Sequence, residues 1–166
     1  MLFRNEIFPR DVDAVREILS STGFFEEAPD EIDVAIELAE KALADGNSPE
    51  NYDFVFLDDG EKTLGYACFA RVPCTVSSFE IYWIAVHNDC RGQGLGKRLM
   101  KEVIRLVKDF GATKLVLQTA GREQYLPTQK FYQACGFKEE ARLKNYYAAG
   151  DDCLIYTMDF QAFLTL

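Results

Sequence analysis

Histidine is nearly absent from this sequence of 166 residues, which has only one, and its five cysteines are scattered without a CxxC pair. A metal site needs clustered ligands, so the sequence predicts no metal site and a set of reduced, structural thiols. Long apolar runs are absent as well, and no segment approaches the length of a membrane span. The first residues also lack the pattern of a secretory signal. We therefore expect a soluble, cytoplasmic protein that binds no membrane and forms a single domain over residues 1–166.

Basic residues are scarce in the first third of the chain. Residues 1–60 contain 16 acidic and 4 basic side chains, residues 61–166 contain 11 and 14, and the net charge is −9. Contacts with phosphates supply most of the affinity for nucleic acids, so we do not expect an acidic chain to bind them. The uneven charge suggests one surface for a cationic ligand and another for an anionic one. The alternative is that the acidic side chains of residues 1–60 form a solvent-exposed face that binds no ligand.

The spacing of apolar residues predicts a mixed α/β sheet with helices on its faces. Alternating or continuous apolar segments predict strands over residues 3–7, 52–58, 63–72, 79–86, 114–119, 137–143 and 152–160. Helical periodicity with suitable start and stop signals predicts helices over residues 9–21, 32–43, 95–110 and 127–135.

A glycine-rich turn joins one of these strands to the next helix. Gly92, Gly94 and Gly96 permit a tight turn and a close approach of a ligand to the main chain. The first amides of the helix have no partner within it, and the helix dipole favours negative charge there. Arg91 and Lys97 add positive charge, so the segment predicts a pyrophosphate-binding site. The alternative is a tight turn without a ligand, because the spacing fits neither a Walker A loop nor a dinucleotide fingerprint.

Residues 79–137 closely resemble the core of the GCN5-related N-acetyltransferase (GNAT) superfamily. Its hallmark, Gln/Arg-x-x-Gly-x-Gly/Ala after a strand, is matched by Arg91, Gly94 and Gly96. The preceding Trp-Ile-Ala-Val-His resembles the strand that holds the pantetheine arm, and Lys-Phe-Tyr-Gln-Ala-Cys-Gly-Phe resembles the second signature. The resemblance implies a mixed, mostly antiparallel sheet of about seven strands with helices on both faces. It also implies an acyltransferase that uses acetyl-CoA as co-substrate and acetylates a primary amine by direct attack.

The resemblance further implies which residues form the site. Tyr132 falls on the position that donates a proton to the CoA sulfur, and Glu80 on that of a general base, for which a pKa raised by burial is suitable. The alternatives are a packed aromatic residue for Tyr132, a solvent-facing strand end for Glu80, and a water chain in place of any dedicated base. The residues implied in cofactor binding are Ile84, Ala85, Val86, Arg91, Gly92, Gln93, Gly94, Leu95, Gly96, Lys97, Gln118, Thr119 and Phe131.

One position departs from the family pattern. The family often has an asparagine seven residues before the tyrosine, and this chain has Tyr125 there. Gln118, Thr119 or Gln129 could supply the polar contacts instead.

The acceptor site of the family is built from segments that correspond to residues 20–45, 72–79 and 143–152. Carboxylates and aromatic rings suit an ammonium group; the first of these segments carries carboxylates, and the last carries both kinds of side chain. The residues concerned are Glu26, Glu27, Asp30, Glu31, Asp33, Tyr146, Tyr147, Asp151 and Asp152. We expect the acceptor to be the primary amine of a small molecule or an amino acid. The alternatives are a protein or peptide N-terminal acetyltransferase, a non-catalytic CoA-binding module and a nucleotide-binding structural domain. The sequence leaves open whether the protein forms a homodimer.

Overall fold

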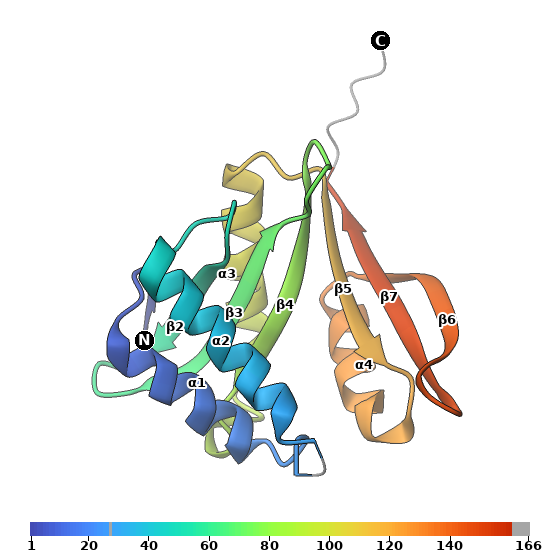
Figure 1. Ribbon diagram of the computed structural model, residues 1–166, viewed down its shortest axis with the longest axis horizontal. Helices are drawn as coiled ribbons and strands as arrows, with labels where there is room; N and C mark the ends of the chain where they lie inside the picture. Colours follow the sequence, from blue (N-terminus) through green and yellow to red (C-terminus); the bar gives the residue numbers. More distant parts are fainter. Residues whose placement is uncertain (27, 161–166) are drawn as a thin grey trace.

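The computed structural model describes residues 1–26 and 28–160 (Figure 1). Strands and helices follow one another along this part of the chain in the predicted order. The strands are β1 (Leu2–Arg4), β2 (Asp53–Asp58), β3 (Thr63–Arg71), β4 (Ser78–Val86), β5 (Lys114–Ala120), β6 (Lys138–Ala148) and β7 (Asp151–Asp159). The α-helices are α1 (Pro9–Ser21), α2 (Asp30–Asp45), α3 (Leu95–Asp109) and α4 (Leu126–Ala134).

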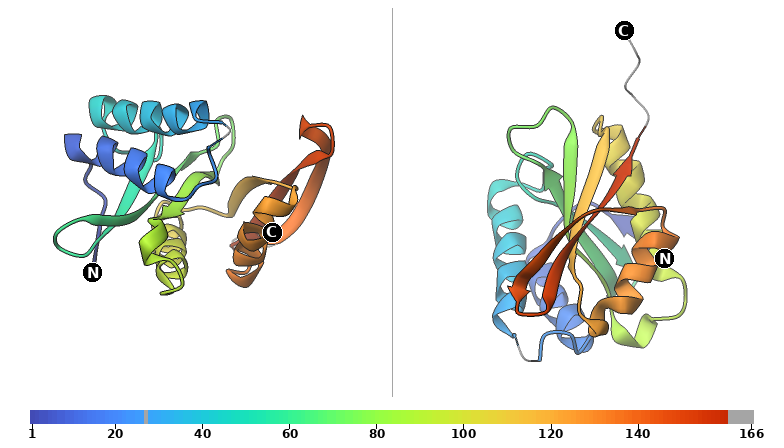
Figure 2. Two further views of the ribbon diagram at one scale, coloured as in Figure 1. Left: turned by 90° about the horizontal axis from the view of Figure 1, so that it is seen from below. Right: turned by 90° about the vertical axis from the view of Figure 1, so that its right-hand side faces the viewer.

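The strands form one sheet of seven, in the order β1-β2-β3-β4-β5-β7-β6. Every neighbouring pair is antiparallel except β4 and β5. This arrangement confirms the predicted mixed, mostly antiparallel sheet with helices on both faces (Figure 2).

Two strand predictions were wrong in their bounds. The first strand covers residues 2–4, because the chain beyond Arg4 leaves the sheet and leads into α1. The hairpin strand β6 continues to Ala148, although its apolar pattern ends earlier. All residues of β6 are exposed, so burial imposes no alternation on this edge strand.

The core consists of two layers, one on each face of the sheet. Alternate residues of β2 and β3 point to opposite faces, as the pleat of a strand requires. Phe54 and Tyr66 pack in the cluster under α1 and α2, whereas Val55 and Phe69 pack in the cluster under α3 and α4. The helix α3 buries the apolar stripe that its sequence predicts, including Leu99 and Val103, which are fully buried.

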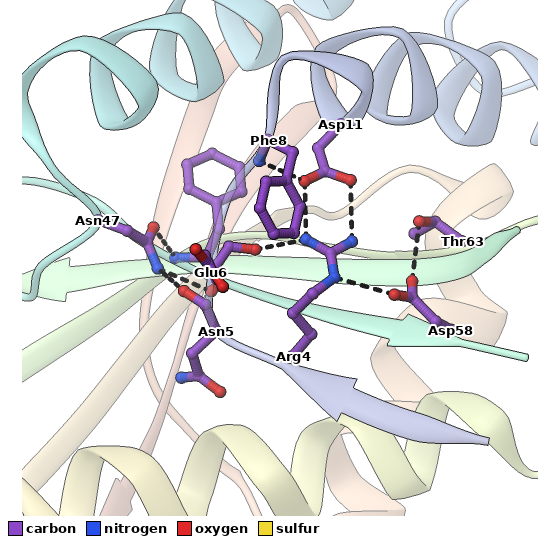
Figure 3. Close-up of polar contacts among 9 residues, drawn as sticks. Arg4, Asn5, Glu6, Phe8, Asp11, Asn47, Asp58 and Thr63 are labelled. Atoms are coloured by element: carbon purple, nitrogen blue, oxygen red, sulfur yellow. Dashed lines mark hydrogen bonds and ion pairs between the residues drawn. The ribbon is translucent and has the colours of Figure 1, made fainter. Parts of the chain in front are cut away.

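An ion-pair cluster fixes α1 against the sheet (Figure 3). Arg4 donates to the two carboxylate oxygens of Asp11 at 2.8 and 2.9 Å, and its Nε donates to Asp58 at 2.9 Å. The Asp11 side chain is fully buried and also accepts from the Phe8 amide at 2.7 Å, which caps the helix. Arg4 thereby connects β1, α1 and β2, and sets the direction in which α1 runs toward the functional site.

The strands β4 and β5 diverge along their length (Figure 1). Their parallel pairing covers only four residue pairs, from Ser78 with Lys114 to Ile81 with Leu117. A β-bulge follows on β4, because Ile81 pairs with Phe69 and Trp83 pairs with Cys68, which leaves Tyr82 unpaired. The second half of β4 is therefore paired with β3 alone.

Candidate functional site

A cavity of about 820 Å³ lies where β4 and β5 diverge. Its walls come from the end of β4, the end of β5, the glycine turn before α3, helix α4, the α1–α2 loop and the β6–β7 hairpin. The site therefore combines segments from nearly the whole described chain, and the parting of the two parallel strands opens the space between them.

The end of β4 forms one wall of the cavity. Ile84, Ala85 and Val86 line it and pair on their other side with β3. The backbone groups of this segment that point away from β3 have no strand partner within the described chain. Backbone N–H and C=O groups need hydrogen-bond partners, so this wall suits an extended ligand that carries amides.

The glycine turn closes one end of the cavity. Gly92 and Gly94 both have φ of +74°, which favours glycine, and a Cβ at either position would meet no atom within 4 Å. The space above the turn is therefore open to a ligand. Gly96 is needed for another reason: a Cβ there would lie 3.3 Å from the Phe131 ring, so this glycine lets α3 approach α4 closely.

The predicted turn residues differ in how they contact the cavity. Arg91, Gly92 and Gly96 line it, and the Leu95 side chain is buried in the core. Gln93, Gly94 and Lys97 are not part of the lining. The amides at the start of α3 remain available to an anion, because they have no acceptor within the helix.

Tyr132 lines the cavity from α4 with only 8% of its surface exposed. Its ring packs against Phe131, Phe137 and Tyr156, with ring centroids 5.5, 6.1 and 6.0 Å away. Burial raises the pKa of Tyr132 well above that of an ordinary phenol. A phenol of ordinary pKa is already protonated at physiological pH, so Tyr132 carries a proton that it can donate.

Glu80 lies next to the cavity and does not line it. Its neighbours Phe79 and Ile81 pack in the cluster under α3, so Glu80 points to the opposite face of the sheet. There its Oε1 accepts a hydrogen bond of 3.0 Å from Gln118 Nε2. Burial raises the pKa of Glu80, and the Gln118 hydrogen bond lowers it by a smaller amount. Gln118 and Thr119 both line the cavity, so Gln118 contacts Glu80 from the cavity wall.

The acidic side chains expected around an acceptor mostly serve other purposes. Asp151 is 5% exposed and binds Arg122 at 2.9 Å. Asp152 accepts from the backbone of the hairpin and pairs with Arg142, while Asp33 pairs with Arg16 on the outer surface. Glu26 and Asp30 are not part of the cavity lining, and Glu27 falls outside the described residues. Among the described residues that line the cavity, Glu31 is the only carboxylate without an ion pair.

Two aromatic rings form a bridge across the cavity that sequence reasoning missed. Phe24 in the α1–α2 loop contacts Tyr125, which precedes α4, with ring centroids 5.2 Å apart. The Arg91 guanidinium lies 5.5 Å from the Phe24 ring, and that of Arg122 lies 5.0 Å from the Tyr125 ring. Tyr125 stands where the related family often has an asparagine, so the bridge is a feature of this chain. The only signal for it was an aromatic pair, Phe24-Phe25, within an acidic loop.

Metal-binding and membrane-spanning features are both missing from residues 1–26 and 28–160. No group of three or more His, Cys, Asp and Glu side chains there could hold a metal ion. No helix in this part of the chain is long and apolar enough to cross a membrane.

Known proteins share both the sequence and the fold of this chain. Residues 12–137 match the profile of the Acetyltransferase (GNAT) family. A solved GNAT-family protein from Desulfovibrio desulfuricans is 40% identical, with a TM-score of 0.91 over 95% of this chain and 98% of that one. An aminoglycoside 6'-N-acetyltransferase, solved in complex with coenzyme A, shares the fold at 17% identity, with a TM-score of 0.75 over 96% and 97% of the two chains.

A curated relative matches a shorter part of the chain. N-alpha-acetyltransferase 30 from Schizosaccharomyces pombe is 31% identical over 78 residues, which are 47% of this chain and 51% of that protein. The match therefore spans about half the length of this relative.

Proposed function

Because the chain belongs to the acetyltransferase (GNAT) family, we propose that it transfers the acetyl group of acetyl-CoA to a primary amine. The observation that carries this proposal is the cavity between β4 and β5. One of its ends is a glycine turn at the start of a helix, one wall is a strand edge whose backbone groups have no strand partner within the described chain, and a buried phenol lines it. Together these three features suit a thioester whose amide arm carries a diphosphate.

The residues of the cavity fit acetyl-CoA as a co-substrate. The open space above Gly92 and Gly94 and the charge of Arg91 suit the diphosphate. The free backbone groups of residues 84–86 suit the amides of the pantetheine arm, and a backbone N–H of this segment can stabilise the charge that develops on the thioester oxygen.

The chemistry requires that the amine lose a proton and that the sulfur gain one. The acceptor nitrogen forms a bond to the acetyl carbon while the carbon–sulfur bond breaks. We propose that Glu80 accepts the proton that the amine loses. Glu80 does not line the cavity and contacts Gln118, which does, so the proton passes through a water molecule. We assign the proton that the thiolate gains to the Tyr132 hydroxyl, which is protonated at neutral pH and lines the cavity.

The acceptor end of the cavity suits one amine next to an apolar group. Phe24, Phe25, Tyr125 and Tyr147 line it together with the unpaired carboxylate of Glu31. A single free carboxylate among aromatic rings is poorly suited to a polycation, which needs several. Our first candidate for the acceptor is therefore a small amine or amino acid with an apolar side chain.

A second candidate is the N-terminal amine of a polypeptide. The similarity to an N-alpha-acetyltransferase supports it, and so do the exposed rings of Tyr146 and Tyr147 in the β6–β7 hairpin beside the cavity. A peptide needs such a surface next to the site, whereas a free amino acid does not.

A panel of acceptors tests the proposal. The protein is mixed with acetyl-CoA and with free amino acids, short peptides, simple amines or polyamines, and the release of free thiol is followed. We expect turnover with apolar monoamines or peptides, and little with polyamines. CoA binding measured by calorimetry, combined with no turnover for any amine, would instead identify a non-catalytic CoA-binding module.

A further inference from the structure

Four side chains form a continuous hydrogen-bonded chain across four adjacent strands. Tyr147 on β6 donates to Cys153 Sγ on β7 at 3.7 Å, and Cys153 Sγ donates to Gln118 Oε1 on β5 at 3.5 Å. Gln118 Nε2 then donates to Glu80 Oε1 on β4 at 3.0 Å. The strands β4, β5, β7 and β6 are neighbours in this order. The hydrogen-bonded chain therefore crosses four of the seven strands, with one residue from each.

The direction of donation is fixed by the chemistry of the end groups. An ionised carboxylate only accepts, so Gln118 must turn its NH₂ group toward Glu80 and its carbonyl oxygen toward Cys153. The thiol must then donate its proton to that oxygen, which leaves the sulfur to accept from Tyr147. Cys153 is fully buried, so no solvent competes for its thiol.

The Cys153 thiol therefore selects the orientation of the Gln118 amide. Without a donor at this position, the amide could rotate by half a turn and present its oxygen to the Glu80 carboxylate. Two oxygen acceptors facing each other repel, and a half-buried carboxylate that loses its donor becomes less stable in its charged form. A buried cysteine in a β-strand usually contributes only packing, but here its proton has a defined acceptor.

The surroundings of Glu80 leave this amide as its main polar partner. The strand partners of Glu80 are Ala70 on β3 and Val116 on β5, neither of which is charged. The titratable groups nearby are Tyr82 on the same strand, Tyr52, whose ring contacts that of Tyr82 at 5.4 Å, and Cys68 on β3. Burial raises the pKa of Tyr82 to about 12, and the Glu80 charge adds to this effect.

The basic side chain at the start of β5, on the same face as Gln118, is already paired. Lys114 binds Asp159 at 2.7 Å and lies 3.8 Å from Glu140. Lys114 is the first residue of β5, Asp159 is the last of β7, and Glu140 lies near the start of β6. In the described part of the chain, Gln118 is the one side chain that donates a hydrogen bond to Glu80.

We propose that Gln118 and Cys153 are positioning residues that hold the Glu80 carboxylate ready to accept the proton of the amine. The inference rests on the proposed role of Glu80 as general base. Gln118 binds the carboxylate, and Cys153 acts through Gln118 by fixing its amide. Tyr147 is the first residue of the hydrogen-bonded chain. It lies in the β6–β7 hairpin next to the proposed amine site and also lines the cavity.

A titration of the protein without substrate tests the positioning directly. The carboxyl carbon of Glu80 is followed by NMR in protein labelled at glutamate, and Glu80→Gln identifies its signal. Burial raises the pKa of Glu80, and the hydrogen bond from Gln118 lowers it. Gln118→Met removes that hydrogen bond, so we expect the titration midpoint of Glu80 to move to higher pH. We expect Cys153→Ala to move the Glu80 midpoint in the same direction. Cys153→Ser keeps a donor of similar size, so its Glu80 midpoint should stay close to that of the wild type.

The pH dependence of kcat/KM provides the second measurement. We expect Gln118→Met and Cys153→Ala to lower kcat/KM more at pH 6 than at pH 8.5, because a higher pKa leaves the base protonated at low pH. The melting temperature serves as the control for folding in every variant. A general structural defect would lower the rate equally at both pH values and would not distinguish serine from alanine at position 153.

The outcomes separate this inference from the proposed function. If the wild-type protein acetylates no amine, or if Glu80→Gln keeps the wild-type pH profile, the role of Glu80 as base is wrong. If Glu80→Gln removes the acidic limb of the profile but Gln118→Met and Cys153→Ala leave both the NMR midpoint and the profile unchanged, the positioning roles of Gln118 and Cys153 are overturned.

Discussion

The buried carboxyl of Asp53, at the start of β2, should make the protein more stable when it is replaced by asparagine. Asp53 is 4% exposed, and burial raises its pKa from 3.8 to about 6, although Asn47 Nδ2 donates to it at 2.7 Å. A folded-state pKa above that of the unfolded state means that the folded protein favours the protonated carboxyl. The contribution of Asp53 to stability is therefore fully present below about pH 4, and is lost as the pH rises to about 6.

The size of the effect follows from the difference between the two pKa values. About two pH units correspond to about 3 kcal/mol, which is the largest penalty that the ionised carboxylate imposes above pH 6. Asparagine has nearly the same shape, cannot ionise and keeps an oxygen for Asn47. We expect Asp53→Asn to raise the free energy of unfolding by up to about 3 kcal/mol at pH 8, and to change it little near pH 4.

Urea denaturation at pH 4, 6 and 8 measures this difference between the variant and the wild type. Asp13→Asn is the matched control, because Asp13 is an exposed residue of α1 and its replacement should have little effect at any pH. The reasoning would be refuted if Asp53→Asn were less stable than the wild type at pH 8, or if its advantage did not change between pH 4 and pH 8.

Three further predictions concern the site and its support. Tyr132→Phe keeps the ring packing but removes the proton donor, so kcat should fall about a hundredfold or more while CoA affinity, measured by calorimetry, is retained; an unchanged kcat would exclude the acid role. Glu31→Gln should raise the KM of the amine severalfold without changing kcat, and an unchanged KM would show that Glu31 does not bind the acceptor. Arg4→Met leaves the fully buried Asp11 without its ion pair and should cost about 3–5 kcal/mol in urea denaturation, whereas a loss below 1 kcal/mol would contradict the supporting role of Arg4.

The fold was largely predictable because the apolar pattern is strong where burial is strong. Helix α3 and strands β2 to β5 each pack at least one face in the core, and their predicted bounds are close to those in the structure. The prediction failed at the edges of the sheet, in β1 and β6, where few side chains are buried and periodicity carries little information. The predicted acyltransferase class and the family resemblance are confirmed by the match over residues 12–137 and by the similarity to the solved GNAT-family protein.

The site was predictable where its residues are close together in sequence. Ile84, Ala85, Val86, Arg91, Gly92 and Gly96 lie in one strand and turn, so a local pattern was enough to predict residues that line the cavity. Contacts between residues far apart in sequence left no such pattern. The pair Glu80–Gln118 is separated by 38 positions, and Phe24 meets Tyr125 only because the α1–α2 loop folds over the cavity. The assignment of most acidic residues to the acceptor was too broad, since charge counts do not show which carboxylates are paired within the fold.

Mass spectrometry of an acetyl-CoA reaction tests the central claim most directly. The protein is incubated with acetyl-CoA labelled in the acetyl group and a mixture of apolar amino acids and short peptides, with a variant that carries Tyr132→Phe as the control. The account predicts that labelled acetyl groups appear on α-amino nitrogens, at a rate that the control lowers strongly. CoA that binds in the cavity while no amine in the mixture acquires the label would contradict it.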